Sequence, residues 1–449
     1  RLLMDHSGEY DNFLQSMRDK AGVTATLDNA KYPTRYMGFD DEEIADSLAV
    51  LRHWQRTQVK SKAGRTATLI NFIALHDGNR LPGGVSMNAR PLAILLAVLL
   101  CAAAPARAQV SPTTGAEVPS GRLLPVLVSV GHGYGTARTD GKNVQAAGAG
   151  KVALWGLQQA DIVYESLLYR DEQKNAASTR LTLLFSDALI RGEAVECGPV
   201  RSLRDVSALL REEWQGALAF GSTMGAGYLG DAVERLKADS AAAFDIVDIR
   251  RGGLGARLQG VKAPSNLSVE VNTVQARVPA DSIARPFAFL QESEETVSSW
   301  DAVSSLSDVS AAASVSLDWG DARYLARFLW NEEAGGYLRE VAGWPFACYP
   351  TARARMTGDE GAMVRPAFAN VIVQWVAYDA LSPTVQTPLL VGEGAADLFV
   401  GGRHVQGTWS RAACDARTLY WGESGREVLL EPGKTWIALF PANASLIFE

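Results

Sequence analysis

Apolar runs of strand length recur between residues 122 and 285, with polar segments between them. Leu123–Val130 is one continuous apolar run, and Asp161–Tyr169 and Thr179–Phe185 are two more that a polar stretch joins. Two such runs with a polar connection predict a β-hairpin. Ser202–Trp214 instead repeats its apolar residues at helical spacing, so we expect a helix there with Ser202 as its N-cap.

The same alternation continues further along the chain. Ala217–Phe220 predicts a short strand, Tyr228–Lys237 a second helix and Phe244–Ile249 another strand. Strands that alternate with helices are typical of an α/β layer in which part of the sheet is parallel. We therefore expect residues 122–285 to form an α/β N-terminal domain, a mixed sheet with helices.

The pattern changes after residue 285. Residues 286–310 are largely rich in Ser and Glu and are interpreted as a linker. Beyond them, short apolar segments alternate with Gly-rich turns, which predicts a sandwich or rolled sheet and thus a mainly-β C-terminal domain over residues 311–449. The strands that we expect are Ala313–Trp319, Tyr324–Trp330, Asn370–Tyr378, Leu389–Val391, Leu398–Val400, Thr418–Trp421, Val428–Leu430 and Thr435–Phe440.

Residues 87–108 have the pattern of a signal peptide. Arg90 supplies positive charge, residues 92–104 form a short apolar run, and Ala106-Arg107-Ala108 is a small-x-small cleavage site. The run is about 13 residues long, against roughly 20 needed to span a bilayer. We expect a periplasmic or secreted protein with no membrane span after cleavage, and residues 109–121, rich in Pro, Thr and Gly, as a linker.

Residues 1–86 precede this signal peptide, although a signal peptide works at an N-terminus. One hypothesis is that translation begins at Met87 and that residues 1–86 are upstream reading frame, because the sequence given starts with Arg1 and the codons of Gly83-Gly84 can spell a ribosome-binding site. The alternative is a genuine helical extension, since an acidic stretch at residues 40–43 precedes apolar positions at helical spacing. Both interpretations stay open.

Composition and charge exclude several classes of function. An apolar content of 47% and a charged content of 21% are those of a globular protein. The net charge of −7 provides no basic footprint, so we expect no nucleic-acid partner. After residue 108 the only histidines are His132 and His404, so we expect no metal site. The glycine-rich stretches at 131–135 and 252–255 lack phosphate-loop spacing, so we expect no cofactor.

Cysteine positions leave one question open. Cys348 and Cys414 could pair in an oxidising compartment, or could be two separate buried thiols. No CxxC occurs, which excludes a zinc ribbon or a redox motif of that type. The oligomeric state is not predicted by any feature of the sequence.

The polar residues with candidate chemistry lie on the expected hairpin and on the turn before the first expected helix. Glu165 interrupts an apolar strand, where a carboxylate needs a partner or solvent, and Arg180 could be its partner across the hairpin. Gly198-Pro199 sets a tight turn that brings Arg201, Ser202 and Arg204 to the helix start, where free N–H groups favour an anion. The alternative is that Arg201 pairs with Glu165 or Asp205 and only fixes the turn.

Three functions follow from this pattern. The first is a ligand-binding or scaffold protein that holds a small anionic or cell-wall ligand in a polar cleft near Glu165, Arg180 and Arg201. The second is a hydrolase or transferase of an envelope polymer that uses Glu165 with a nearby Asp, either Asp161 or Asp205. The third is a structural partner protein that acts through the β domain, for which exposed Trp409 and Trp436 would be the signal.

Several short motifs, in order along the chain, resemble those of one bacterial family. They are GLQQADIVYESL (157–168), TRLTLLFSD (179–187), GPVRSLRD (198–205), APSNL (263–267), NVIVQ (370–374), GTW (407–409) and GKTWI (433–437). Together they resemble the YerB-like lipoprotein family (DUF3048), which has an N-terminal and a C-terminal domain. The resemblance covers residues from about 120 to 449. It implies a cell-envelope protein, often lipid-anchored, in a family with no agreed activity.

The resemblance adds one residue to the candidate set and brings three departures. Glu165, Arg180, Arg201 and Asn266 match the family pattern, so Asn266 joins the expected ligand-binding residues. The lipid-attachment site is lost, because Leu100 precedes Cys101 where a small residue would be needed, and this would make the chain a soluble periplasmic member of the family. Two histidines of the family are also missing, at Ser265 in the APSNL stretch and within the segment Ala219–Ser222. If those histidines were catalytic or metal-binding in relatives, this chain would be an inactive or altered version.

Overall fold

The computed structural model describes residues 108–132, 135–139, 143–147, 153–222, 246–250, 253–279, 282, 287–290, 309–383 and 385–449. The expectations for residues 1–86, for nearly all of the signal peptide at 87–108, for the helix at 228–237 and for most of the linker at 286–310 lie outside these residues. The unit described below begins at Ala108 and ends at Glu449.

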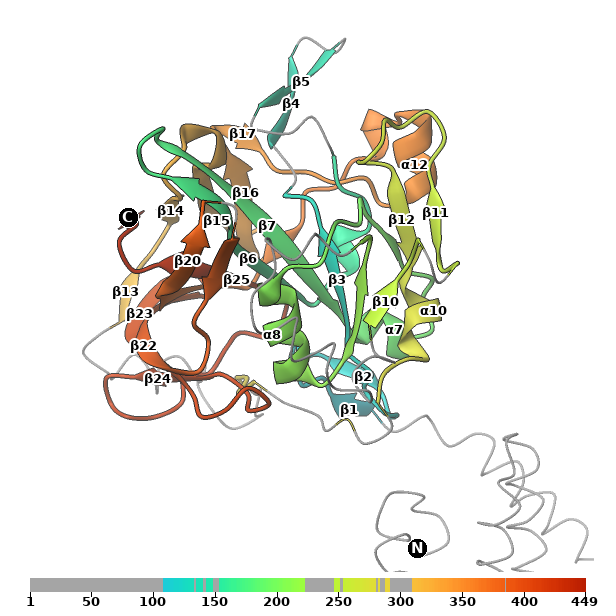
Figure 1. Cartoon of the computed structure of the whole chain (residues 1–449). Helices are drawn as coiled ribbons and strands as arrows, with labels where there is room; N and C mark the ends of the chain where they lie inside the picture. Colours follow the sequence, from blue (N-terminus) through green and yellow to red (C-terminus); the bar gives the residue numbers. More distant parts are fainter. Residues whose placement is uncertain are drawn as a thin grey trace, which may run out of the picture. The chain divides into compact units, whose positions relative to one another are not determined.

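One sheet of eleven strands runs through this unit and contains strands from both halves of the chain (Figure 1). In spatial order its path is β10 (Ile246–Asp248), β9 (Ala217–Phe220), β3 (Val126–Val130), β7 (Ala176–Phe185), β6 (Ile162–Asp171), β25 (Thr435–Pro441), β19 (Asn370–Val376), β22 (Gly392–Val400), β23 (Arg403–Arg411) and β13 (Val309–Ala311), with β24 (Leu419–Gly422) paired to β23. Strand β25, close to the C-terminus, lies parallel to both β6 and β19. It therefore joins the strands of the first half to those of the second.

Smaller sheets surround the main one. A six-stranded sheet holds β17 (Trp344–Pro345), β16 (Gly336–Val341), β15 (Ala326–Asn331), β14 (Ser314–Asp318), β26 (Ser445–Phe448) and β18 (Ala367–Phe368). A three-stranded sheet has the order β11 (Gly255–Arg257), β12 (Leu267–Glu270), β8 (Glu196–Cys197). Three pairs complete the set: β1 (Ala108–Val110) with β2 (Glu117–Pro119), β4 (Gly135–Thr139) with β5 (Asn143–Ala147), and β20 (Tyr378–Ser382) with β21 (Val385–Pro388).

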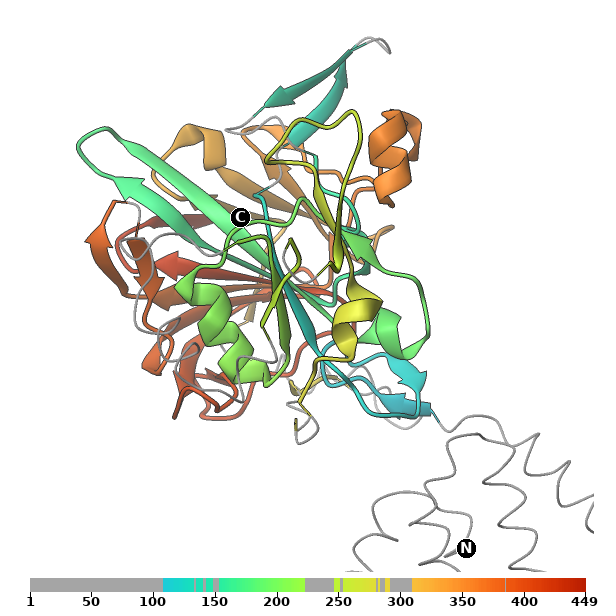
Figure 2. The same ribbon diagram turned by 45° about the vertical axis from the view of Figure 1, so that its right-hand side comes forward.

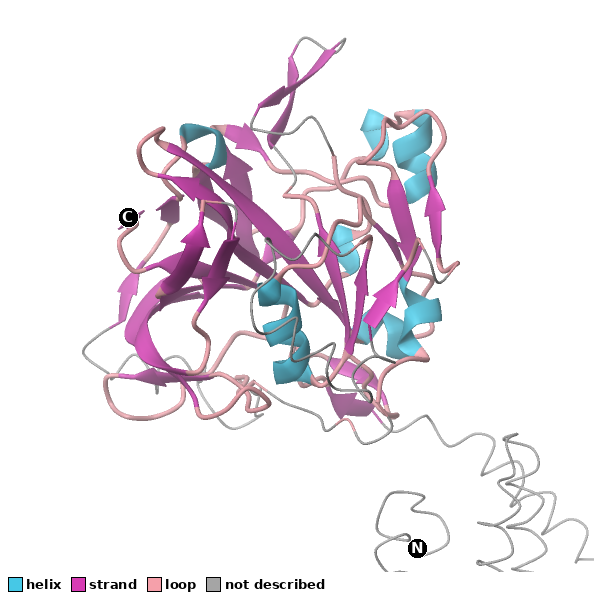
Figure 3. Ribbon diagram, in the orientation of Figure 1, coloured by secondary structure: helices cyan, strands magenta, loops and turns pink. Residues whose placement is uncertain are grey.

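Helices are few and short in the described part of the chain (Figure 3). They are α7 (Asp187–Ile190), α8 (Asp205–Trp214), α10 (Val271–Gln275) and α12 (Ala352–Thr357), together with the 3-10 turns η1 (Leu157–Gln159), η4 (Ala322–Tyr324) and η5 (Glu360–Ala362). The fold class expected for residues 122–285 is therefore wrong: the described chain is mostly β, and it contains no distinct α/β domain. Tertiary pairing decided the outcome, because the apolar runs extend into long strands and share their sheet with the C-terminal half.

The core around the main sheet consists of two layers, one on each face of the sheet. Because side chains alternate along a strand, Val163 and Leu183 enter one layer, while Ile162 and Leu184 enter the other. Helix α8 covers the second face, where Trp214 Nε1 donates to Tyr164 Oη at 2.8 Å. Each large apolar side chain buried in this way contributes about 1.5–3 kcal/mol to folding.

The hairpin of β6 and β7 reaches beyond the rest of the main sheet (Figure 2). Its strands pair antiparallel, and the register shifts between Leu167 and Tyr169. The hairpin that the sequence predicts is therefore present, with longer strands than expected. The aromatic side chain of Trp436 in β25 is fully buried against the rings of Phe328, Phe346 and Phe368, which attaches the six-stranded sheet to the first layer of the core.

Candidate functional site

The two faces of the β6–β7 hairpin hold different charged residues. In the register of the two strands, Glu165 lies opposite Leu181, and Ser166 lies opposite Arg180. Adjacent positions on a strand point to opposite faces, so Glu165 and Arg180 face different layers of the core. The expected pairing of Glu165 with Arg180 does not occur.

Glu165 instead lies at the centre of a buried polar network. Arg339 Nη2, from β16, donates to both carboxylate oxygens of Glu165 at 3.0 and 3.1 Å. Thr179 Oγ1 donates to Oε1 at 2.8 Å, and His132 Nε2 lies 3.0 Å from the same oxygen. Burial alone would raise the pKa of Glu165, but Arg339, His132 and Thr179 outweigh burial and lower it. The carboxylate is therefore ionised, and its hydrogen-bonding capacity is largely taken by these three partners.

Arg339 is a residue that the sequence analysis missed. The side chains of Arg339 and Glu165 are both 0% exposed. The guanidinium lies 4.4 Å from the ring centroid of Trp436 and 4.6 Å from that of Phe346. Its Nε and Nη1 have no hydrogen-bond partner, so these aromatic faces supply the remaining favourable contacts of the cation. The sequence did contain a signal for Arg339, because this arginine occupies an inward-facing position of a strand, between Tyr337 and Val341.

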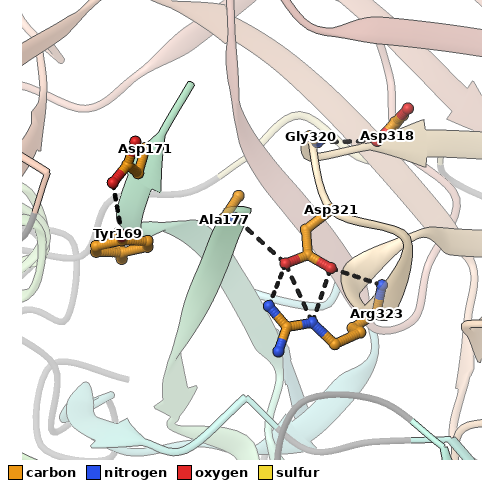
Figure 4. Close-up of polar contacts among 7 residues, drawn as sticks. All are labelled: Tyr169, Asp171, Ala177, Asp318, Gly320, Asp321 and Arg323. Atoms are coloured by element: carbon orange, nitrogen blue, oxygen red, sulfur yellow. Dashed lines mark hydrogen bonds and ion pairs between the residues drawn. The ribbon is translucent and has the colours of Figure 1, made fainter. Parts of the chain in front are cut away.

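Asp321 forms an ion pair with Arg323 and also a hydrogen bond to β7 that links the two halves of the chain (Figure 4). Asp321 accepts from the backbone N–H of Ala177 in β7 at 3.4 Å and from the backbone N–H of Arg323 at 2.9 Å. Arg323 Nη2 also pairs with the Asp321 carboxylate at 2.5 Å. These contacts position Tyr324, whose ring meets that of His132 edge-on with centroids 4.6 Å apart. The network around Glu165 is thus closed on several sides.

Arg180 presents the contrasting case on the other face of the hairpin. Its side chain is 4% exposed, its Nη1 is buried without a hydrogen-bond partner, and no carboxylate among the described residues pairs with it. Burial, together with the neighbouring charges of Arg201 and Arg204, lowers the pKa of Arg180 to about 9. Burial likewise lowers the pKa of Arg201. We call Arg180, Arg201 and Arg204 the arginine cluster.

The arginine cluster lies at the start of helix α8. The helix begins at Asp205, with Arg204 at the N-cap and no side-chain cap, so the expected helix start at Ser202 is wrong. Arg180, Arg204, Asp205 and Val206 line a small pocket with a volume of about 10 Å³. That volume accommodates about one water-sized group, so only the charged end of a ligand could enter. The positive end of the α8 dipole adds to the attraction for an anion.

The other candidate residues lie around or apart from this pocket. Ser202 is half-buried, and its backbone carbonyl accepts from Ser129 Oγ at 3.3 Å. Asp205 Oδ2 accepts from Thr387 Oγ1 at 2.9 Å, in the pocket wall. Asn266 is buried and bonds elsewhere, since its Oδ1 accepts from Arg257 Nη1 at 2.7 Å. The structure thus groups three arginines, places Glu165 on the opposite face, and gives Asn266 partners in the three-stranded sheet.

A third buried charged group lies just before β6. Asp161 Oδ2 accepts from Thr113 Oγ1 at 2.8 Å and from the backbone N–H of Asp187 at 3.0 Å. Burial and the nearby Asp187 carboxylate raise the pKa of Asp161 from its ordinary value of 3.8 to about 7, although Lys434 opposes them. Residues 111–114, in the segment expected to be a linker, are buried, and Ser111 and Thr114 donate to Asp187.

Other expectations can be placed in the same way. Trp409 and Trp436 are 3% and 0% exposed. Cys348 and Cys414 are not joined by a disulfide in the described structure. None of the described helices is long and apolar enough to cross a membrane. No group of three or more His, Cys, Asp or Glu side chains arranged to hold a metal ion occurs within the described ranges.

Comparison with known proteins identifies the family. Residues 148–284 match the N-terminal domain of the protein family of unknown function DUF3048, and residues 315–437 match its C-terminal domain. The chain belongs to the DUF3048 family. The solved structure of YerB from Bacillus subtilis has a TM-score of 0.52 with this chain at 19% identity, over 76% of this chain and 99% of that one. This likeness shows a shared fold, and the resemblance seen in the sequence is confirmed.

A different relationship covers the start of the chain. Residues 1–93 match the C-terminal domain of the cellulose biosynthesis protein BcsG. BcsG of Escherichia coli K12 is 39% identical over 83 residues, and BcsG of Salmonella typhimurium LT2 is 40% identical over 83 residues. Each match covers 18% of this chain and 15% of the relative. This match ends well before the arginine cluster and before both DUF3048 domains.

Proposed function

We propose that this DUF3048 protein is a ligand-binding protein whose arginine cluster holds the anionic end of a small ligand. The observation that carries the proposal is Arg180, a guanidinium that is 4% exposed and has no carboxylate partner in the described structure. A buried charge without a partner costs several kcal/mol. An anion in the adjoining pocket would supply the missing partner.

The surroundings of Arg180 support an anion rather than a neutral ligand. Arg201 and Arg204 add like charge, which destabilises the empty site further. The N-terminus of α8, where Asp205 and Val206 line the pocket, contributes the positive end of the helix dipole. Guanidinium groups favour the planar, two-oxygen geometry of carboxylate and phosphate groups. The ligand that fits best therefore ends in one of these two groups.

The enzymatic alternative has less support. Glu165 is the carboxylate on which a hydrolase or transferase would depend, and Arg339, Thr179 and His132 already occupy it. A lowered pKa also opposes use of Glu165 as a general acid. The structural-partner alternative has lost its signal, because Trp409 and Trp436 are both buried.

We also propose that the protein is exported and acts in the cell envelope. The pattern of a signal peptide at residues 87–108 supports export. The compact unit from Ala108 to Glu449 supports it too, because cleavage after Ala108 would remove only the first residue of that unit. Intact mass and N-terminal sequencing of the protein from a periplasmic extract test this proposal. A chain that begins at Gln109 is expected, and a chain that retains residues 87–108 contradicts it.

Anion titration tests the ligand-binding proposal. Inorganic phosphate and acetate are added to the purified protein at constant ionic strength, and the melting temperature and the heat of binding are measured. We expect saturable stabilisation by at least one of the two anions in the wild type. The variant Arg180→Met removes the guanidinium and keeps most of the side-chain volume, so it should abolish the saturable response.

A matched control uses an arginine outside the cluster. Arg327 in β15 is exposed, so Arg327→Met makes the same change in net charge at a distant site. It should bind the anion as the wild type does. Equal responses in the wild type, Arg180→Met and Arg327→Met would show a non-specific salt effect and would reject the arginine cluster as the site.

A further inference from the structure

A second cleft lies on the outer face of the three-stranded sheet β11-β12-β8. The inner face of this sheet packs into the core through Cys197, Leu267 and Val269, which are all nearly fully buried. Because side chains alternate along each strand, Glu196, Ser268 and Glu270 point to the other face. These three residues line a cleft of about 550 Å³, and Pro350 and Thr351 at the start of α12 form part of its wall. Figures 1 and 2 show α12 beside β11 and β12.

Two carboxylates in this cleft lie opposite each other without a cation. Glu196 and Glu270 are direct partners in the antiparallel register of β8 and β12, so their Cβ atoms are about 4.5–5.5 Å apart. Like charges in that position destabilise a strand pair. Neither carboxylate has an ion-pair partner in the described structure, and no Lys or Arg is among the residues that line the cleft. A bound cation would relieve this repulsion.

One of the two carboxylates is held in place before any ligand arrives. The buried indole of Trp155 donates through Nε1 to Ser268 Oγ at 3.0 Å, and Ser268 Oγ donates to Glu196 Oε1 at 2.8 Å. A chain of hydrogen bonds of this kind fixes the acceptor and strengthens it. The carboxylate of Glu270 is exposed and has no hydrogen-bond partner in the described structure, so it can close on a ligand from the rim.

The size and composition of the cleft define the class of ligand. A volume of about 550 Å³ lies within the range of small-molecule sites, roughly 300–1,000 Å³. The charged groups in the lining are carboxylates, so the complementary group is cationic. The described residues hold no set of three metal-type ligands, which favours an organic cation over a metal ion. Thr351 Oγ1 accepts from the N–H of Ala354 and keeps its hydroxyl proton for a neutral oxygen of the ligand.

We propose that this cleft binds a primary ammonium group carried on a small polar molecule that also offers a hydroxyl or carbonyl oxygen. Glu196 and Glu270 hold the ammonium group between them, and Thr351 donates to the neighbouring oxygen. Amino sugars and free amines of short peptides both have this chemistry. No residue that lines this cleft belongs to the arginine cluster or its pocket, so the test of this proposal is independent of the test of the anion proposal.

Calorimetric titration with three probes tests this site: glucosamine, N-acetylglucosamine and glycyl-glycinamide. Glucosamine carries the amine on a sugar, N-acetylglucosamine has the same ring with the amine blocked, and glycyl-glycinamide is a peptide amine without a carboxylate. We expect glucosamine or the peptide to bind and N-acetylglucosamine not to bind. Whichever of the first two binds more tightly identifies the source of the ammonium group.

Variants then assign the binding to the two carboxylates. Each of Glu196→Gln and Glu270→Gln removes one charge-assisted hydrogen bond and should weaken the binding of the better probe by about tenfold. The double variant should show no binding. Glu333→Gln, at an exposed position in the turn between β15 and β16, is the matched control and should bind normally. Equal affinity for blocked and free amine, or full binding by a folded double variant, would overturn the proposal.

Discussion

The two faces of the β6–β7 hairpin each hold a buried charged residue, but only one of these residues has a partner of opposite charge in the described structure. On one face, Glu165 is enclosed by Arg339, Thr179 and His132, and its carboxylate has a partner for each oxygen. On the other face, Arg180 is almost as deeply buried and has two further arginines nearby. The two residues are fifteen positions apart in the sequence and resemble each other in burial, yet only the first has its charge compensated inside the protein.

We interpret this difference as that between a charge with a structural role and a charge that is available to a ligand. A compensated buried charge holds elements together, and here Glu165 and Arg339 join β6 to β16. A buried charge without a partner raises the free energy of the ligand-free protein. A ligand of opposite charge removes that cost when it binds. Buried charged residues can therefore have different roles, and the interaction partners of each residue distinguish these roles.

The largest expected effect comes from breaking the compensated pair. Arg339→Met removes the permanent cation beside the buried Glu165 and leaves only His132, among the described residues, as a charge partner, which should lower the free energy of unfolding by about 3–5 kcal/mol. Chemical denaturation measures the change. Adding Glu165→Gln to that variant should restore part of the loss, because the buried charge is then removed. Arg365→Met, which affects a half-exposed pair with Glu340, should cost less than about 1 kcal/mol. Equal losses for Arg339→Met and Arg365→Met would contradict the structural role of Glu165.

Asp161 provides an intermediate case, because Lys434 and Thr113 compensate it only in part against Asp187. Its pKa in the folded state, about 7, is above the ordinary 3.8, so the fold favours the protonated form. The contribution of Asp161 to stability should therefore be greatest below about pH 4 and should fall as the pH rises from about 4 to about 7, by roughly 2–4 kcal/mol.

Denaturation curves at a series of pH values measure this dependence. Asp161→Asn mimics the protonated form, so its stability should be nearly independent of pH across the same window. Asp415→Asn, at an exposed position, should retain the dependence of the wild type. The prediction fails if Asp161→Asn and the wild type lose stability in parallel.

A smaller effect of opposite sign is expected on the uncompensated face. Arg180→Met removes a buried charge that has no carboxylate partner, so the ligand-free protein should become more stable by about 1–2 kcal/mol. Thermal and chemical denaturation in buffers without phosphate or carboxylate measure this. Destabilisation of more than about 1 kcal/mol would indicate that Arg180 is structural, like Arg339, and would remove the contrast between the two faces.

The smallest effect concerns the second uncompensated pair, Glu196 and Glu270. Glu270→Gln removes like-charge repulsion across the strand pair and should stabilise the ligand-free protein by about 0.2–1 kcal/mol. The effect should shrink at high salt, because Glu270 is exposed and its charge is screened. A stabilisation that does not depend on salt would point to a cause other than charge.

The sequence predicted local elements well and the pairing between distant elements poorly. The β6–β7 hairpin, the strand Ala217–Phe220 and the strand around Thr435–Phe440 all follow from apolar runs. The place of β25 between β6 and β19 could not be predicted, because the sequence of a buried apolar strand does not indicate which strands pair with it. The α/β assignment failed for the same reason. Alternating short elements suggested a self-contained layer, whereas the strands of the first half require a strand from the end of the chain.

The candidate site shows a similar division. The sequence selected Glu165, Arg180, Arg201 and Arg204, and each has an unusual buried or charged environment. The sequence analysis paired Glu165 with Arg180 because both lie on one hairpin. A shift in strand register near Leu167 places the two side chains on opposite faces of the sheet, and no motif encodes that shift. Arg339 lies 174 residues beyond Glu165, so local sequence patterns could not predict that Arg339 pairs with Glu165.

The position of β25 has a consequence for how the chain matures. Until residue 441 has been synthesised, β6 and β19 each lack the central neighbour that lies between them in the finished sheet. An incomplete chain therefore exposes two long, apolar strand edges, the kind of surface that pairs with other chains and aggregates. The main sheet therefore cannot be completed until the last fifteen residues, 435–449, are available.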